Sequence, residues 1–150
     1  MGKRRRAREA AIQFHFWRDL QGGKEPERID DFFEFCPVKP SVREFAQPLI
    51  EGMVAQLPEI DERICRYCEN YEFKRISAVD RNVLRLAIYE MLYRDDIPPV
   101  VSINEAIELA KTFGGGESGR FVNGILDRVK DDLQRPLREA VSSSEKQKQD

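Results

Sequence analysis

The sequence predicts an all-helical protein, and two observations predict it. Apolar residues recur at spacings of three and four along most of the chain, as in Ala7, Ala10, Ala11 and Phe14. No stretch of useful length alternates apolar and polar residues as a half-buried strand does. At 150 residues, the chain suits one compact domain or two subdomains that share a core.

The sequence predicts three helical segments before Pro58 and a fourth that begins at Pro58. One begins among the basic residues at the start of the chain, and the phenylalanine cluster at 29–35 favours a short helix or turn. Ser41 and Glu44 form a capping box that begins the next helix, which should stop near Pro58. Because proline is accepted at the first position of a helix, Pro58 can begin a further one.

The remaining helices have explicit start and stop signals. A polar cap precedes a helix that is apolar over a wide arc and therefore central. A full capping box begins the next helix and a run of three glycines ends it. The last helix begins at Glu117 or Ser118 and closes before a proline. In chain order, these signals are Ser77 with Asp80, Ser102 with Glu105, Gly114 to Gly116, and Pro136.

Composition excludes several classes of protein. No apolar run approaches the ~18 residues of a membrane span, and the basic N-terminus lacks the apolar core of a secretory signal. We therefore expect a cytoplasmic protein without a membrane role. Residues 142–150 are polar and lack an apolar period, so we expect one domain at 1–136 and a polar, disordered tail at 137–150.

The cysteines and the single histidine do not form a recognisable reactive site. The three cysteines are an odd number, which does not suit a disulfide framework. Cys65 and Cys68 form a CxxC pair, but a structural zinc site needs four ligands and only Cys36 and His15 remain. Both members of the pair fall on the predicted apolar stripe, so we expect buried structural cysteines. We expect no enzyme activity, no cofactor and no metal.

Positive charge is concentrated at the start of the chain. The whole chain has a net charge of only −2, yet its first eight residues include Lys3, Arg4, Arg5, Arg6 and Arg8. Cations in the first turn oppose the helix dipole, at a cost of roughly 0.3–1 kcal/mol each. An arrangement that works against local stability indicates an anionic partner with many phosphates, such as nucleic acid. The alternative is a solvated basic terminus.

Two aromatic residues have alternative interpretations. Phe16 lies nearly opposite the main apolar face of the first helix, where it either packs in a core or forms a rim that stacks unpaired bases. Phe121 lies beside Arg120 and Asn123, shortly after the glycine run. It either packs at the core edge or contacts a base or partner near a helix N-terminus that can take phosphate.

Four segments of the sequence resemble the NusB family of transcription antitermination factors, over about residues 4–133. They are RRRAREAA at 4–11, VDRNVLRLAIYE at 79–90, SINEAIELAK at 102–111 and RFVNGILD at 120–127. The resemblance implies an all-α fold of two small helical bundles that share a core. It also implies binding of single-stranded boxA-type leader RNA together with the ribosomal protein NusE. This assembly helps RNA polymerase resist termination, notably on ribosomal RNA operons.

The resemblance also implies roles for particular residues. The basic segment from Lys3 to Arg8 corresponds to the RNA-binding segment of the family, and Phe121 lies where the family uses an aromatic residue near RNA. Asp80 falls in the region that faces NusE, and Glu117 and Ser118 lie in a turn near the surface for RNA and partner.

The sequence departs from the family at Phe14-His15-Phe16, where relatives commonly carry a Leu-Tyr pair. A tyrosine hydroxyl contact is therefore missing there, although Phe16 can still stack. The alternative function is a helical protein-interaction module without specific RNA binding, in which the arginines are incidental. Whether the free protein is a monomer or a homodimer stays open.

Overall fold

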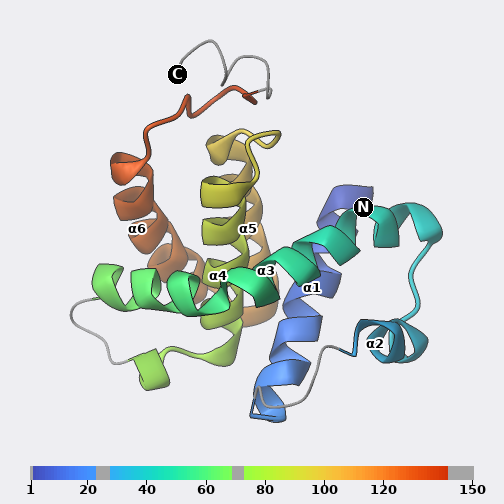
Figure 1. The fold of residues 1–150 in the computed structure, drawn as a ribbon. Helices are drawn as coiled ribbons and strands as arrows, with labels where there is room; N and C mark the ends of the chain where they lie inside the picture. The colour runs from blue at the N-terminus through green and yellow to red at the C-terminus, as the bar shows by residue number, and fades with distance from the viewer. Residues whose placement is uncertain (1, 23–27, 69–72, 142–150) are drawn as a thin grey trace. The chain divides into compact units, whose positions relative to one another are not determined.

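The computed structural model describes residues 2–22, 28–68 and 73–141, and within these ranges the secondary structure is entirely helical (Figure 1). The chain divides into two compact units, Met1–Leu57 and Pro58–Asp150. The expectation of an all-helical fold is confirmed.

The first unit contains α1 (Lys3–Leu20), α2 (Ile29–Phe35) and the first part of α3 (Pro40–Tyr67). Aromatic contacts join α1 to α2, since the Phe14 ring meets the Phe32 ring edge-on with 5.5 Å between centroids. Arg43 of α3 lies over the Phe33 ring of α2 at 4.5 Å and forms an ion pair with Asp30. The core of this unit is aromatic and aliphatic side chains, with Phe14 and Leu49 fully buried.

The second unit contains the remainder of α3, the short 3-10 helix η1 (Phe73–Arg75), α4 (Ala78–Tyr93), α5 (Pro99–Gly114) and α6 (Gly116–Asp132). The last three helices pack against one another, and Figure 1 shows them side by side. Every residue of α4 from Asn82 to Met91 is buried, so this helix is central, as its wide apolar arc predicts. Arg85 of α4 also forms a bidentate pair with Asp61 of α3, at 2.8 and 2.9 Å.

The predicted break at Pro58 is wrong, because α3 is one helix that continues through Pro48 and Pro58. A proline inside a helix removes one hydrogen bond and crowds a carbonyl, at a cost of roughly 3 kcal/mol. Burial offsets this cost, since Met53 and Ile60 are both fully buried on either side of Pro58. The helix also begins at Pro40, one residue before the predicted capping box.

The predicted start of α5 at Ser102 is also wrong. The helix begins at Pro99, which occupies a first-turn position where a missing N–H costs nothing. Ser102 therefore lies inside the helix, where it is 2% exposed and its hydroxyl donates to Glu90 Oε1 at 2.8 Å. The apparent cap is a buried contact between α5 and α4.

The Ser77 cap acts as predicted, and the glycine run ends α5, but α5 includes Gly114 and α6 begins at Gly116, just before the predicted start near Glu117 or Ser118. Ser77 caps α4 by accepting a hydrogen bond from the Asp80 N–H at 3.1 Å. Gly115 separates α5 from α6 with a φ of +88°, a conformation that favours glycine.

Packing continues beyond the predicted domain end at residue 136. The Val100 N–H donates to the Leu137 carbonyl at 2.9 Å, and the Val141 N–H donates to the Asp95 carbonyl at 2.7 Å. Val141 is only 7% exposed. Contacts thus extend five residues into the segment expected to be a tail, and the rest of that segment, 142–150, lies outside the described residues. No helix in the described ranges is long and apolar enough to cross a membrane.

Candidate nucleic-acid interface

The five predicted cations occupy the first two turns of α1, and their side chains differ in exposure. The first turn contains no acidic residue, so nothing there balances the positive charge against the helix dipole. Lys3 and Arg4 are exposed, and Arg5 and Arg6 are half-buried. Arg8 is only 3% exposed. The segment therefore presents its charge mainly through its first residues.

Two of the arginines lie over one aromatic ring. Arg4 and Arg8 are one helical turn apart on α1, and their guanidinium carbons lie 4.8 and 5.6 Å from the centroid of the Phe45 ring on α3. A cation over an aromatic face is stabilised by about 0.5–1 kcal/mol at exposed sites and by more when it is desolvated. Phe45 therefore fixes the direction of both side chains.

Another arginine is oriented by an acid on the next turn of α1. Arg6 Nη1 lies 3.1 Å from Glu9 Oε2. Phe45 and Glu9 were not predicted from the sequence as supporting residues. The i,i+3 spacing of Arg6 and Glu9 was a usable signal, whereas the contact of α1 with Phe45 is tertiary and has no local signal.

The structure separates the two apolar residues on the second face of α1. Ile12 is buried, whereas Phe16 is 39% exposed. Ile12 therefore belongs to the core, and Phe16 is an accessible aromatic ring on the helix that carries the arginines. His15, which precedes Phe16 in the chain, is buried, and its ring meets the Phe14 ring edge-on.

The start of α6 carries the second set of candidate residues. Arg120 and Asn123 are exposed and Phe121 is half-buried, all within the first turns of the helix. Glu117 is exposed, and the Ser118 hydroxyl donates to the Gly114 carbonyl at 3.2 Å, which ties α6 to the end of α5. The first turns of α6 pack closely against α5. At Gly119 there is no room for a Cβ, which would lie 2.8 Å from Lys111 Cγ.

Asp80 lies at the N-terminal end of α4, where a negative charge is favoured by the helix dipole. Its Oδ1 atom is buried, and no hydrogen-bond partner for it is found among the described residues. The basic segment and Phe16 belong to the first unit, whereas Asp80 and the α6 residues belong to the second. Each unit thus holds its own set of candidate residues.

The expectation of two buried cysteines is wrong for Cys65, which is exposed, while Cys68 is buried. The buried stripe of α3 runs from Ile60 through Ile64 to Cys68 at steps of four, which leaves Cys65 to one side. In the part of the chain that the structure describes, no cluster of histidine, cysteine and acidic residues could hold a metal ion.

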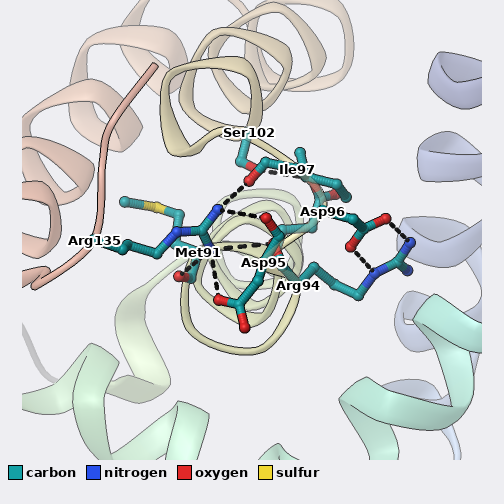
Figure 2. Close-up of polar contacts among 8 residues, drawn as sticks. Met91, Arg94, Asp95, Asp96, Ile97, Ser102 and Arg135 are labelled. Carbon is teal, nitrogen blue, oxygen red and sulfur yellow. Dashed lines mark hydrogen bonds and ion pairs between the residues drawn. The ribbon is translucent and has the colours of Figure 1, made fainter. Parts of the chain in front are cut away.

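Arg135 is a structural residue whose role was not predicted from the sequence. Figure 2 shows its guanidinium group turned toward the backbone that follows α4. It donates to the carbonyls of Met91 at 3.0 Å, Arg94 at 3.1 Å and Ile97, and it lies 3.6 Å from the Asp95 carboxylate. Burial lowers the pKa of Arg135 from its usual value. This residue holds the fold and does not belong to the interface.

Comparison with known proteins gives consistent results along nearly the whole chain. The NusB family model matches residues 5–131. The transcription antitermination protein NusB of Desulfatibacillum aliphaticivorans is 44% identical over 129 residues, which cover 86% of this chain and 90% of the relative. That of Myxococcus xanthus (strain DK1622) is 43% identical over 140 residues, which cover 91% and 100%.

Solved structures give the same result. T. maritima NusB matches with a TM-score of 0.78 at 41% identity, covering 88% of this chain and 93% of that chain. A chain from the crystal structure of the antitermination factors NusB and NusE in complex with double-stranded RNA matches with a TM-score of 0.78 at 27% identity, covering 89% and 99%. The fold and these relatives define an all-helical transcription antitermination factor rather than an enzyme. The chain belongs to the NusB family.

Proposed function

We propose that this protein binds single-stranded boxA-type leader RNA together with the ribosomal protein NusE. In this proposal it works in the cytoplasm as part of an RNA polymerase antitermination complex on ribosomal RNA operons. The observation that carries the proposal is the basic start of α1, where Arg4 and Arg8 lie over Phe45. The similarity to a NusB chain solved with NusE and double-stranded RNA supports NusE and RNA as the two partners, and the single-stranded form is our proposal.

The basic segment suits phosphate binding for an electrostatic reason. Its cations oppose the dipole of α1, so the free protein carries an unfavourable interaction that a phosphate chain would relieve. Because Phe45 and Glu9 already orient three of the arginines, less side-chain entropy is lost on binding.

We assign RNA contacts to residues of both units. Phe16 offers an exposed ring for base stacking, and Phe121 offers a partly exposed one. The exposed side chains of Arg120 and Asn123 offer a cation and an amide. Arg8 is buried and in this proposal acts mainly by supporting its neighbours. The proposed RNA-binding residues are Lys3, Arg4, Arg5, Arg6, Arg8, Phe16, Arg120, Phe121 and Asn123.

We assign the NusE contact to Asp80, Glu117 and Ser118. Asp80 supports this assignment because its buried Oδ1 has no hydrogen-bond partner among the described residues, so a side-chain rotation that exposes this oxygen would let it accept a hydrogen bond from a partner protein. Glu117 is exposed at the first turn of α6, where it is accessible.

Fluorescence anisotropy with labelled boxA-type RNA and a scrambled control, with and without NusE, tests the proposal. We expect selective binding that NusE tightens. If four or five phosphates are neutralised, the slope of log K against log[salt] should be about −3 to −3.5, at ~0.7 per contact. Equal, weak binding to both RNAs that NusE does not change would contradict the proposal and leave a protein-interaction module.

A charge-matched pair of variants separates the basic segment from general electrostatics. The triple variant Arg4→Ala, Arg5→Ala, Arg6→Ala should flatten the salt slope by about 2 and abolish selectivity. The control Lys39→Ala, Lys74→Ala, Arg138→Ala removes the same charge from exposed positions elsewhere. It should leave the slope and selectivity close to those of the unmodified protein.

A further inference from the structure

The end of α3 carries two cysteines with different accessibility. Cys65 is exposed and lies in the last turn of the helix, whereas Cys68 follows the helix end at Tyr67 and is 2% exposed. The Cys68 N–H donates to the Ile64 carbonyl at 2.9 Å, so the backbone keeps a helical turn up to this residue. The two side chains are therefore neighbours across one turn, with Cβ atoms about 5–6 Å apart.

This separation is close to what a disulfide needs. A disulfide joins Cβ atoms about 3.5–4.5 Å apart, so closure requires a shift of roughly 1–2 Å. The shift falls in the terminal turn of the helix, where the last carbonyls have no intrahelical partner and the backbone adjusts most easily. A bond closed in this way retains some strain and is easily reduced.

The two thiols differ in burial and therefore in how readily each reacts with a reagent in solution. Burial raises the pKa of the Cys68 thiol, with a further rise from Cys65 and an opposing effect from Arg128. Cys65 is accessible to reagents in solution. Cys65 is therefore suited to react first, and Cys68 to react afterwards with the sulfur of Cys65.

A cavity of about 360 Å³, lined by charged side chains and a tyrosine, lies beside this turn. Arg66, Tyr67, Arg128, Asp131 and Asp132 line it, so residues of both charge signs border the cavity, and Arg128 and Asp132 are also hydrogen-bonded to Tyr67. This mixture of charges suits a small peptide that carries both ammonium and carboxylate groups, as glutathione disulfide does.

We propose that Cys65 and Cys68 are an oxidation site that forms a reversible intramolecular disulfide by exchange with a low-molecular-weight peptide disulfide. The Cys65 thiolate attacks one sulfur of glutathione disulfide, the reagent's S–S bond breaks, and the first glutathione leaves as a thiolate that takes up a proton. Cys68 then loses its proton to water and attacks the Cys65 sulfur, which releases the second glutathione. Two cysteine thiols are oxidised, and one disulfide is reduced to two thiols.

The disulfide would act on the contact between α3 and α6. Tyr67 lies between the two cysteines, and its carbonyl accepts a hydrogen bond from Arg128 Nη1 at 2.7 Å. Its hydroxyl also donates to Asp132, the last residue of α6. Closing the ring around Tyr67 changes the backbone that holds both contacts.

Thiol counting and peptide mapping of the full chain test the proposal. The protein is equilibrated in buffers with increasing ratios of glutathione disulfide to glutathione, quenched with acid and digested with trypsin. Because Arg66 lies between the two cysteines, trypsin separates peptide 64–66 from peptide 67–74 unless a disulfide holds them together. We expect the linked pair to appear as the ratio rises, to disappear with excess glutathione, and to leave one free thiol.

Single substitutions supply the controls. Cys36→Ser should still form the linked pair and retain no free thiol, whereas Cys65→Ser and Cys68→Ser should not form it. Cys68→Ser should instead accumulate a glutathione adduct on Cys65, since the second step is blocked. The proposal is overturned if the pair stays reduced at every ratio, if Cys36 is found in the bridge, or if only bridges between two chains form.

Discussion

Phe45 shows how one side chain organises charge at the residue scale. It carries no charge, yet its ring lies under Arg4 and Arg8 of another helix. Its contribution to RNA binding would thus be indirect, through the positions of cations that the sequence already reveals.

Replacing this ring tests that role. Phe45→Leu preserves an apolar side chain but removes the aromatic face, so about 0.5–1 kcal/mol is lost for each cation. If the whole loss of about 1–2 kcal/mol for the two cations falls on binding, RNA affinity should fall about five- to thirtyfold, while the salt slope stays the same because no charge is removed. Anisotropy titrations at two salt concentrations measure both quantities. Phe113→Leu, at an exposed ring of α5, is the control, and a flatter slope in Phe45→Leu would contradict the argument.

Ser102 gives a prediction about stability. Its hydroxyl donates to the buried Glu90 carboxylate, and a hydrogen bond to a charged group contributes about 1.5–3 kcal/mol. Ser102→Ala should lower the free energy of unfolding in urea by roughly that amount. Thr112→Ala removes an exposed hydroxyl that bonds only within its own helix, and should change the free energy by less than about 0.5 kcal/mol. Equal effects of the two substitutions would exclude a special role for the buried pair.

At the scale of helices, local signals and tertiary packing disagree at two places. Pro58 and the Ser102 capping box are sound local signals, yet α3 continues through the first and α5 starts before the second. In both cases the buried surface decides, and a single sequence does not show which residues another helix will cover. The apolar repeat from Met53 to Ile64 crosses Pro58 without a change of phase and was the available clue.

The candidate site follows the same division between local and tertiary information. The basic start of α1 and the glycine turn before α6 could be predicted because they depend on local sequence, whereas the sequence left open whether Phe16 packs in a core or is exposed. Phe45 could not, since its contact joins α1 to α3, and Arg135 could not, since its partners lie about 40 residues earlier. The predicted burial of Cys65 was wrong because the apolar stripe predicted for this part of α3 was wide. The sequence did not show that Cys65 lies at the exposed edge of that stripe and not at its buried centre.

Arg135 leads to a prediction for the end of α4. Its planar group satisfies several carbonyls at once, which the single ammonium of lysine cannot reproduce. We expect Arg135→Ala to lower the free energy of unfolding by about 2–4 kcal/mol, because buried carbonyls lose their partner. Arg135→Lys should recover only part of this loss. The exposed neighbour Arg138→Ala is the control in thermal unfolding, and full recovery with lysine would show that charge alone matters.

At the scale of the whole molecule, two compact units account for the chain, with a division at Leu57 and Pro58. Sequence composition suggested either one domain or two subdomains, and the resemblance to the family implied two bundles. The end of the second unit was less apparent, because Leu137 and Val141 are isolated apolar residues in a polar stretch and show no period.

Truncation tests where the second unit ends. A chain that stops after Val141 should be as stable as the full chain, because the contacts of Val141 and Leu137 remain. A chain that stops after Pro136 loses a buried valine and two backbone hydrogen bonds, and we expect its free energy of unfolding to be lower by roughly 2–4 kcal/mol. Urea denaturation of the three chains measures the difference, and equal stability would place the end of the unit at 136.

The hydrogen bonds of Arg135 also set an order for synthesis on the ribosome. The Ile97 carbonyl accepts a hydrogen bond from a side chain that is added 38 residues later, and the Asp95 carbonyl accepts one from the same side chain and another from the N–H of Val141. A nascent chain that has already released α4 and α5 therefore still lacks the hydrogen bonds that Arg135 makes at their junction. The second unit is complete only when the last part of the chain has emerged, so a chain released just before residue 135 would contain all the helices of the unit but lack the contacts that Arg135 makes at the end of α4.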